Sequence, residues 1–342
     1  MKGALAWLRR RWLLIVALIA FAIFVILQFG NLQRLGRTLL TAQLQWIVLA
    51  VLLQVVYYSL YAVLYQVSFA AVEVSGQALE LLPVLFASIF LKAVVPSGGV
   101  SAVAVFVDDA ARRRQSAARA GEGALLVLVA DLFTTIPYII FGLSYLSAQG
   151  VLAFYQVLVS VLFVLFALAM AGVLLLGRLR PGRLRAVLEA AQRTINNLAA
   201  RFKRPPILPP DWAQKNAQEC IGAACNIAAH PVPLARSLLV AFLVHAVNVA
   251  CLYVVSVAYN EPLAIGAAVA GFSMDVVFSV INIIPHGIGI VEGVMALIFI
   301  SLGIPLDKAL AITIAFRGLN LWLPIAIGFF LLPRVRSFGA GG

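Results

Sequence analysis

Two short segments of the chain carry proline, glycine and polar residues inside long apolar stretches. The first reads Lys92-Ala-Val-Val-Pro96-Ser97-Gly98-Gly99, and the second reads Asn282-Ile-Ile-Pro285-His286-Gly287-Ile-Gly289-Ile-Val-Glu292. Proline ends a helix, and glycine lets the backbone approach a ligand closely. A helix broken in this way exposes amide groups, and the half-helix that follows directs its positive dipole end toward the break. The pattern predicts two anion-binding tips, although a hairpin turn that serves only packing has a similar composition.

Six ionisable residues lie in or beside these apolar stretches: Lys92, Asp131, Asp275, His286, Glu292 and Arg317. Such residues are costly in lipid and usually mark a pathway, although some only join helices. We predict that Lys92, one turn before the first break, neutralises a phosphate, although it could equally extend its ammonium to the membrane surface or pair with Asp131. Glu292 is expected near a helix start, where its charge suits the dipole, and it could either contact a cationic headgroup or serve as a structural partner of Arg317. Arg317 is expected to form an ion pair with Glu292 or Asp131.

The predicted substrate-binding set therefore joins the two breaks with the charged residues near them. It comprises Lys92, Pro96, Ser97, Gly98, Gly99, Asp131, Asn282, Pro285, His286, Gly287, Gly289, Glu292 and Arg317. The chain has no metalloprotease, nucleotide-binding or nucleophile-elbow motif, and its Cys220–Cys225 spacing does not match a zinc site. We therefore expect no enzyme activity, no metal and no cofactor.

The elements that hold these residues must be membrane helices. Of the 342 residues, 63% are hydrophobic and 11% charged, far from the composition of a soluble domain. The apolar runs are long enough for helices to cross a bilayer. We predict an all-α polytopic membrane protein with six full spans, at residues 12–29, 46–70, 124–146, 152–176, 237–259 and 309–332. Two further stretches, 81–107 and 262–303, are interrupted and are predicted to be re-entrant helical hairpins.

The distribution of basic residues predicts the orientation. The net charge is +12, but the charges cluster in loops, so we expect no nucleic-acid partner. Lys and Arg concentrate in cytoplasmic loops. With both termini cytoplasmic and both hairpins re-entrant, 20 of the 25 Lys and Arg lie inside. The two hairpins then enter from opposite faces of what we expect to be the plasma (inner) membrane.

The opposite entry of the hairpins predicts an inverted repeat within a single transmembrane domain, residues 1–342. Repeat one covers about 46–146 and repeat two about 237–332, with offsets of about 187 to 191 residues. Such repeats with broken helices indicate a transporter site near the bilayer midplane. The basic loop 178–236 between them is predicted to be cytoplasmic and to contain an amphipathic helix, which could lie on the anionic leaflet or cover the bundle.

Several motifs, taken in order, resemble one known family. They are Pro96-Ser-Gly-Gly-Val, the second break through Glu292, Gly303-Ile-Pro, and Ala315-Phe-Arg317-Gly-Leu-Asn-Leu-Trp-Leu-Pro324. This order resembles the lysylphosphatidylglycerol synthase transmembrane-region family, a flippase-like module. The resemblance implies movement of an anionic or aminoacylated lipid between leaflets, with polar residues at the breaks as headgroup contacts. Full-length synthases continue into an aminoacyl-transferase domain, whereas only residues 333–342 follow the last span here, so the chain is expected to be a free-standing member that does not aminoacylate lipid.

We therefore expect a lipid translocase whose partners are membrane lipids: an anionic or aminoacylated phospholipid, a glycolipid or a hopanoid-type lipid. One alternative is a noncatalytic scaffold that presents lipid to a separate biosynthetic enzyme. Another is a membrane-embedded transferase with Glu292 or Asp131 as base. The sequence leaves these alternatives open.

Overall fold

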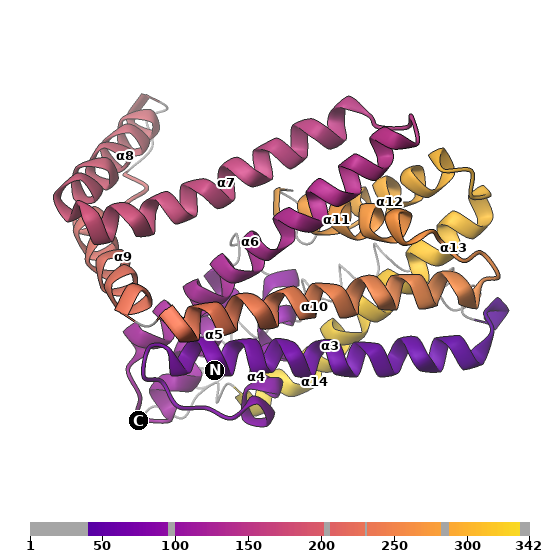
Figure 1. The fold of residues 1–342 in the computed structure, drawn as a ribbon. Helices are drawn as coiled ribbons and strands as arrows, with labels where there is room; N and C mark the ends of the chain where they lie inside the picture. The colour runs from indigo at the N-terminus through magenta and orange to yellow at the C-terminus, as the bar shows by residue number, and fades with distance from the viewer. Residues whose placement is uncertain (1–39, 95–99, 202–205, 230, 282–286, 336–342) are drawn as a thin grey trace, which may run out of the picture.

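The computed structural model describes residues 40–94, 100–201, 206–229, 231–281 and 287–335. All regular elements in this part of the chain are helices (Figure 1). In order they are α3 (Leu44–Ala70), α4 (Ala78–Val94), α5 (Val100–Arg112), α6 (Ala117–Ala148), α7 (Phe154–Leu179), α8 (Pro181–Arg201), α9 (Trp212–Ala229), α10 (Pro231–Ala258), α11 (Ile265–Ile281), α12 (Ile290–Ser301), α13 (Leu306–Arg317), the π-helical turn η2 (Gly318–Trp322) and α14 (Leu323–Val335).

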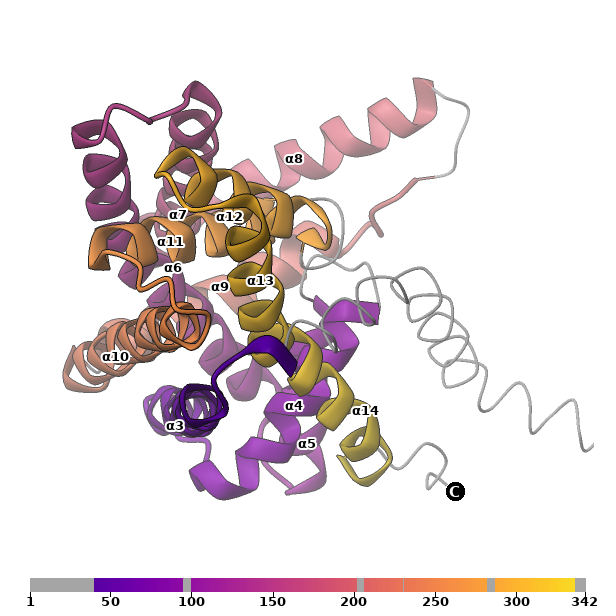
Figure 2. The ribbon, with the colours of Figure 1, turned by 90° about the vertical axis from the view of Figure 1, so that its right-hand side faces the viewer.

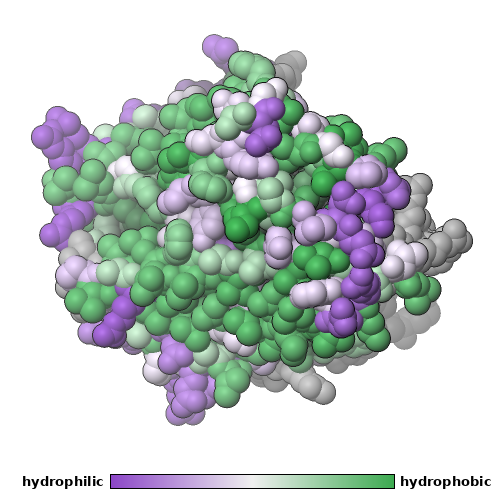
Figure 3. All heavy atoms as spheres, turned by 45° about the vertical axis from the view of Figure 1, so that its right-hand side comes forward, coloured by the Kyte–Doolittle hydropathy of each residue, from purple (hydrophilic) through white to green (hydrophobic). Residues whose placement is uncertain are grey.

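Five helical segments are long and apolar enough to cross a membrane: Leu44–Ala70, Ala117–Ala148, Phe154–Leu179, Pro231–Ala258 and Leu306–Pro333. They match five of the six predicted spans, and the predicted span 12–29 lies outside the described residues. Hydrophobic side chains cover most of the face shown in Figure 3, and hydrophilic ones gather mainly at its left and right margins. The prediction of an all-helical, multi-pass membrane protein is confirmed.

Helices α3 and α10 run antiparallel along the length of the bundle (Figure 1), and Figure 2 shows them side by side, seen nearly end-on. Polar contacts fix their register from end to end. At one end the Gln43 backbone amide donates to the Ala258 carbonyl (2.9 Å). At the other end a hydrogen bond joins the hydroxyls of Ser68 and Ser237 (3.0 Å). Near the middle, Gln54 Nε2 donates to Asn248 Oδ1 (3.2 Å). Buried side-chain bonds of this kind join apolar helices that gain little from hydrophobic association in lipid.

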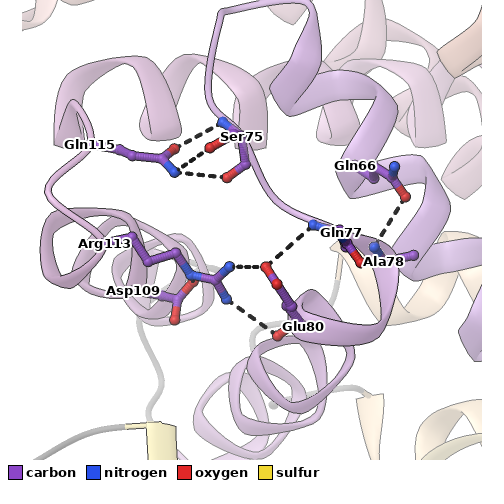
Figure 4. A network of polar contacts seen from close by, with 8 residues as sticks. All are labelled: Gln66, Ser75, Gln77, Ala78, Glu80, Asp109, Arg113 and Gln115. Atoms are coloured by element: carbon purple, nitrogen blue, oxygen red, sulfur yellow. Dashed lines mark hydrogen bonds and ion pairs between the residues drawn. The ribbon is translucent and has the colours of Figure 1, made fainter.

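The first interrupted stretch forms the helix pair α4 and α5, whose outer ends meet. Gln115, just after α5, donates from Nε2 to the Ser75 carbonyl (2.9 Å), just before α4. The Ser75 amide donates to Gln115 Oε1 (2.9 Å), and Arg113, directly after α5, pairs with Glu80 of α4 (Figure 4). The pair therefore begins and ends at the end of the bundle where α3 finishes.

The second interrupted stretch forms α11 and α12, which pack against each other. Helix α13 follows α12, and Lys308 at its start donates from Nζ to the Tyr259 carbonyl (2.9 Å), just after α10. Since α3 and α10 are antiparallel, this pair begins and ends at the opposite end of the bundle from α4 and α5.

Each helix pair packs against the long helix of the other half of the chain. Helix α6 lies against α11, and α14 lies against α4. Both crossings use glycine: a Cβ on Gly142 would lie 3.0 Å from the Ala270 Cα, and a Cβ on Gly328 would lie 2.0 Å from the Phe86 carbonyl oxygen. Only a residue without a side chain permits such close backbone contact.

Helices α8 and α9 project from the end of the bundle that holds α5 (Figure 1). The predicted amphipathic helix is present as α8, with Leu184 buried but Val187, Ile195 and Leu198 exposed. Asn196 Nδ2 donates to the Leu208 carbonyl (3.0 Å), so part of the proline-rich segment after α8 folds back along it.

Candidate functional site

Arg317, at the end of α13, is the centre of a buried ion cluster. Its Nη1 lies 2.9 Å from Asp275 Oδ1 on α11, and its Nε lies 3.0 Å from Glu292 Oε1 on α12. The side chains of Arg317 and Asp275 are only 2% and 5% exposed, and that of Glu292 is 19% exposed. The predicted pairing with Glu292 is found, whereas the alternative of pairing with Asp131 is wrong, because the second carboxylate at Arg317 comes from Asp275 of α11.

Glu292 also caps the helix that follows the second break. Glu292 lies in the first turn of α12, as predicted, and its Oε2 accepts a hydrogen bond from the Gly289 backbone amide (2.6 Å). Gly289 has φ of 87° and Gly287 has φ of 60°, backbone conformations that favour glycine. Glu292 therefore connects the start of α12 directly to Arg317.

The remaining predicted residues of the two breaks lie outside the described part of the chain. In the first break these are Pro96, Ser97, Gly98 and Gly99. In the second they are Asn282, Pro285 and His286. Their predicted role in headgroup contact stays a prediction.

Asp131, on α6, joins three helices. Its Oδ1 accepts the Tyr61 hydroxyl of α3 (3.1 Å) and lies 3.6 Å from His245 Nε2 of α10. Its side chain is 22% exposed. Among the described residues, the second carboxylate oxygen, Oδ2, has no hydrogen-bond partner. One acceptor of this carboxylate is therefore held by the protein, and the other is available to a ligand.

Lys92, near the end of α4, is exposed although Leu91 and Ala93 beside it are buried. Its ammonium forms no hydrogen bond or ion pair with any residue that the structure describes. The charge of Asp131 acts on it electrostatically, but the predicted alternative of a direct Lys92–Asp131 ion pair is wrong.

Four hydrogen bonds around Asp131 and Asn320 match in pairs between the two halves of the chain. The Asp131 carbonyl lies 3.2 Å from His245 Nε2, and the Asn320 carbonyl accepts the Tyr58 hydroxyl (2.8 Å). The Asp131 side chain binds Tyr61, and the Asn320 side chain accepts from Asn248 (3.4 Å). His245 and Asn248 follow Tyr58 and Tyr61 by 187 residues, and Asn320 follows Asp131 by 189. Corresponding positions thus make corresponding contacts.

The sequence-based set missed a row of tyrosines on α3. Tyr57, Tyr61 and Tyr65 recur every fourth residue and so share one helix face. This spacing inside an apolar span was the signal that could have identified them. For metals, no group of three or more His, Cys, Asp or Glu side chains gathers in the described part of the chain.

Comparisons with known proteins agree with the geometry. The family described as the lysylphosphatidylglycerol synthase transmembrane region matches residues 12–328. A UPF0104 membrane protein of Pyrococcus horikoshii is 20% identical over 344 residues, which span 96% of this chain and 98% of that protein. No solved structure matches. Because the family match covers most of the chain, including both interrupted stretches and Arg317, this chain belongs to the lysylphosphatidylglycerol synthase transmembrane-region family.

Proposed function

We propose that this protein is a lipid translocase that moves a lipid with a polar headgroup between the leaflets of the plasma (inner) membrane, without catalysing a chemical reaction. The observation that carries the proposal is the pair of short helical hairpins, α4–α5 and α11–α12, which open at opposite ends of one bundle. Charged residues gather beside these helix pairs: Arg317, Asp275 and Glu292 form one cluster, and Asp131 lies between α3, α6 and α10. A lipid headgroup could reach this region from either end while its acyl chains stay in lipid.

The matched hydrogen bonds of Asp131 and Asn320 support an inverted repeat behind this arrangement. Residues at offsets of 187 to 189 make equivalent contacts with helices of opposite direction. Inverted repeats with broken helices place substrate near the midplane and permit alternating access from the two faces. In the orientation that we propose, both termini are cytoplasmic, and so is the end carrying α8, α9 and the Arg112–Arg119 segment.

The paired hairpins favour a translocase over the alternative of a noncatalytic scaffold for a lipid-biosynthesis enzyme. A scaffold needs a surface for its enzyme partner but no polar groups in its own centre. Within the described residues the Lys92 ammonium has no hydrogen-bond or ion-pair partner, and a charged group inside a membrane is costly unless it meets a polar ligand.

A vesicle assay tests the proposal. The purified protein is reconstituted with phospholipids that carry a fluorophore on one acyl chain, and the loss of signal to a membrane-impermeant quencher is followed. We expect faster exchange between leaflets than in protein-free vesicles, and slower exchange with Lys92→Ala than with the surface variant Lys215→Ala. If the wild type exchanges no labelled lipid faster than empty vesicles do, the translocase is excluded and the scaffold is favoured.

A further inference from the structure

We propose that helix α8 lies on the anionic surface of the leaflet at the end of the bundle that holds α5, with its exposed apolar side among the lipids and its arginines on the phosphates. The sequence alone leaves two positions open for this helix, on the leaflet or over the bundle. This surface lies outside the transmembrane helices, so it can bind lipid whether or not the protein moves lipid between leaflets.

The start of α8 is fixed to the end of a membrane span. Helix α8 follows α7 after a single residue, Arg180, and the last turns of α7 expose Leu175 and Leu179. Leu184 is fully buried on the other side of this junction, and a Cβ on Gly177 of α7 would lie 3.3 Å from its Cδ2. Helix α8 therefore begins where an apolar, exposed helix leaves the lipid.

The direction of α8 suits a membrane surface. In Figure 1 it runs across the direction of α3 and α10, and Figure 2 shows α3 and α10 nearly end-on but α8 from the side. Since α3 and α10 span the membrane, α8 lies roughly in its plane, and its 21 residues reach about 31 Å. Helix α8 packs on α9 and the end of α7, and its far end extends away from the bundle (Figure 2). It does not cover the bundle.

One side of α8 exposes large apolar residues. Val187, Ile195 and Leu198 are all exposed, and spacings of eight and three residues place them on one side of the helix. Glu189, the only acidic residue of α8, lies nine residues before Leu198, which is two and a half turns, so it is on the opposite side. Apolar residues on one side and charge on the other are typical of a helix that lies in a membrane interface.

Arginines supply the charge of α8. There are four, all exposed: Arg183, Arg185, Arg193 and Arg201. Arg183 lies one turn before Val187 and Arg201 one turn after Leu198, so both border the apolar side. None of the four forms an ion pair with a residue that the structure describes. Their guanidinium groups are therefore available to phosphates, which arginine binds through two hydrogen bonds at once.

An anionic lipid surface satisfies both sides of α8, whereas a second copy of the chain does not. If α8 packed against α8 of another copy, as a twofold interface would require, the unpaired arginines of both would be brought together and repel. A leaflet with anionic headgroups offers acyl chains to the apolar side and phosphates to the arginines. The long arginine side chain can reach the headgroups from a helix buried at this level.

The test uses the full chain in nanodiscs, in a background with Cys220, Cys225 and Cys251 replaced by alanine. A fluorophore is attached at Leu198→Cys or at the matched control Ala200→Cys, an exposed position two residues later and so on the other side of α8. The quencher is a lipid with a nitroxide near the top of one acyl chain. In discs of equal parts phosphatidylcholine and phosphatidylglycerol, we expect quenching about threefold stronger at Leu198→Cys than at Ala200→Cys.

The charge dependence is measured with the same probe at Leu198→Cys. Discs of phosphatidylcholine alone should lower its quenching by about half, and Arg183→Gln with Arg201→Gln should do the same in the mixed discs, because the attraction to anionic lipid is weakened. Arg112→Gln with Arg119→Gln removes the same charge at the same end of the bundle but outside α8. This control should leave the quenching unchanged.

Three results would overturn the proposal. Equal quenching of the two probes in the mixed discs rejects the contact of this side with lipid. Quenching at Leu198→Cys that is the same in both kinds of disc and in the arginine variant rejects the anionic surface. A probe at Leu198→Cys that stays shielded from a water-soluble quencher in detergent shows that protein, such as a second copy, covers this side. Melting temperatures close to that of the wild type show that the variants are folded.

Discussion

At the scale of single residues, the ion cluster of Arg317, Asp275 and Glu292 holds three helices together. Removing an ion from water into a low-dielectric interior costs several kcal/mol, and close opposite charges offset this only with good geometry. Here both contacts are within 3.0 Å, and Glu292 makes a further bond to the Gly289 amide. The cluster therefore fixes the start of α12 relative to α11 and α13, next to the second break.

Replacing Arg317 with Ala should destabilise the protein strongly. Asp275 and Glu292 would remain buried beside each other without a cation, which costs about 3 to 5 kcal/mol. The apparent melting temperature in detergent measures the effect. Arg112→Ala breaks an exposed pair with Asp108 and should cost about 1 kcal/mol or less. Equal stability of the two variants would show that the buried cluster contributes little.

Tyr58→Phe should lower the stability of the protein by a smaller amount, because it removes a single hydrogen bond. The Tyr58 side chain is 7% exposed, and its hydroxyl donates to the Asn320 carbonyl in η2. Loss of the donor leaves that carbonyl with one partner fewer, at a cost of about 1 kcal/mol. Melting temperatures of Tyr58→Phe and the exposed control Tyr253→Phe should differ accordingly, and identical values would contradict the bond.

At the scale of elements, the turn η2 explains how Asn320 can contact α3 and α10. A π-helical turn widens the helix and misaligns its backbone bonds, and such turns often occur at functional sites. It follows Arg317 directly, so one segment carries both the ion cluster and the carbonyl that Tyr58 binds. On α6, the equivalent carbonyl of Asp131 accepts the Thr135 hydroxyl (2.8 Å) and lies 3.2 Å from His245 Nε2.

The two glycine crossings make a second prediction at this scale. Gly328→Ala should separate α14 from α4, because its Cβ would lie 2.0 Å from a backbone oxygen that cannot rotate away. Overpacking of this kind costs about 1 to 3 kcal/mol. Gly172→Ala, in α7, is the matched control, since nothing lies within 4 Å of its added Cβ and alanine favours helix. A melting temperature that falls only in Gly328→Ala is expected, and an equal response of the two variants would contradict the tight crossing.

At the scale of the whole molecule, each half of the chain depends on the other for its packing. Hairpin α4–α5 packs on α14 and hairpin α11–α12 packs on α6, while α3 and α10 join the halves along their length. The two hairpins are thus held between opposed long helices and open at opposite ends.

The proposed orientation predicts the labelling of two cysteine variants. In a background with Cys220, Cys225 and Cys251 replaced by alanine, Arg112→Cys should react with membrane-impermeant reagents only from the cytoplasmic side. Lys308→Cys should react only from the outside. Labelling in intact cells and in inverted vesicles gives the measurement, and labelling of both positions from one side would refute the opposite entry of the hairpins.

The sequence alone determined the class of the protein and most of its helices. Long apolar runs need little tertiary context to be recognised, because lipid accepts only helices or closed barrels. Five predicted spans agree with helices of the structure, with ends that differ by several residues: the predicted start at residue 124 lies inside α6, which begins at Ala117, where Ser116 caps the first turn. Ionisable residues in those runs also led to the predicted pairing of Arg317 with Glu292, which the structure contains, whereas a binding role for Lys92 and Asp131 stays a prediction.

Only the tertiary structure decided which polar residues meet. Arg317 pairs with Asp275 as well as Glu292, Asp131 binds Tyr61 and lies near His245, and Lys92 has no partner among the residues that the structure describes. These contacts join residues 25 to 114 positions apart, so they depend on how helices cross and rotate. Local hydropathy carries no information on rotation when most faces of a span are apolar, so the spacing of the tyrosines on α3 could mark a shared face but not the residues that this face meets.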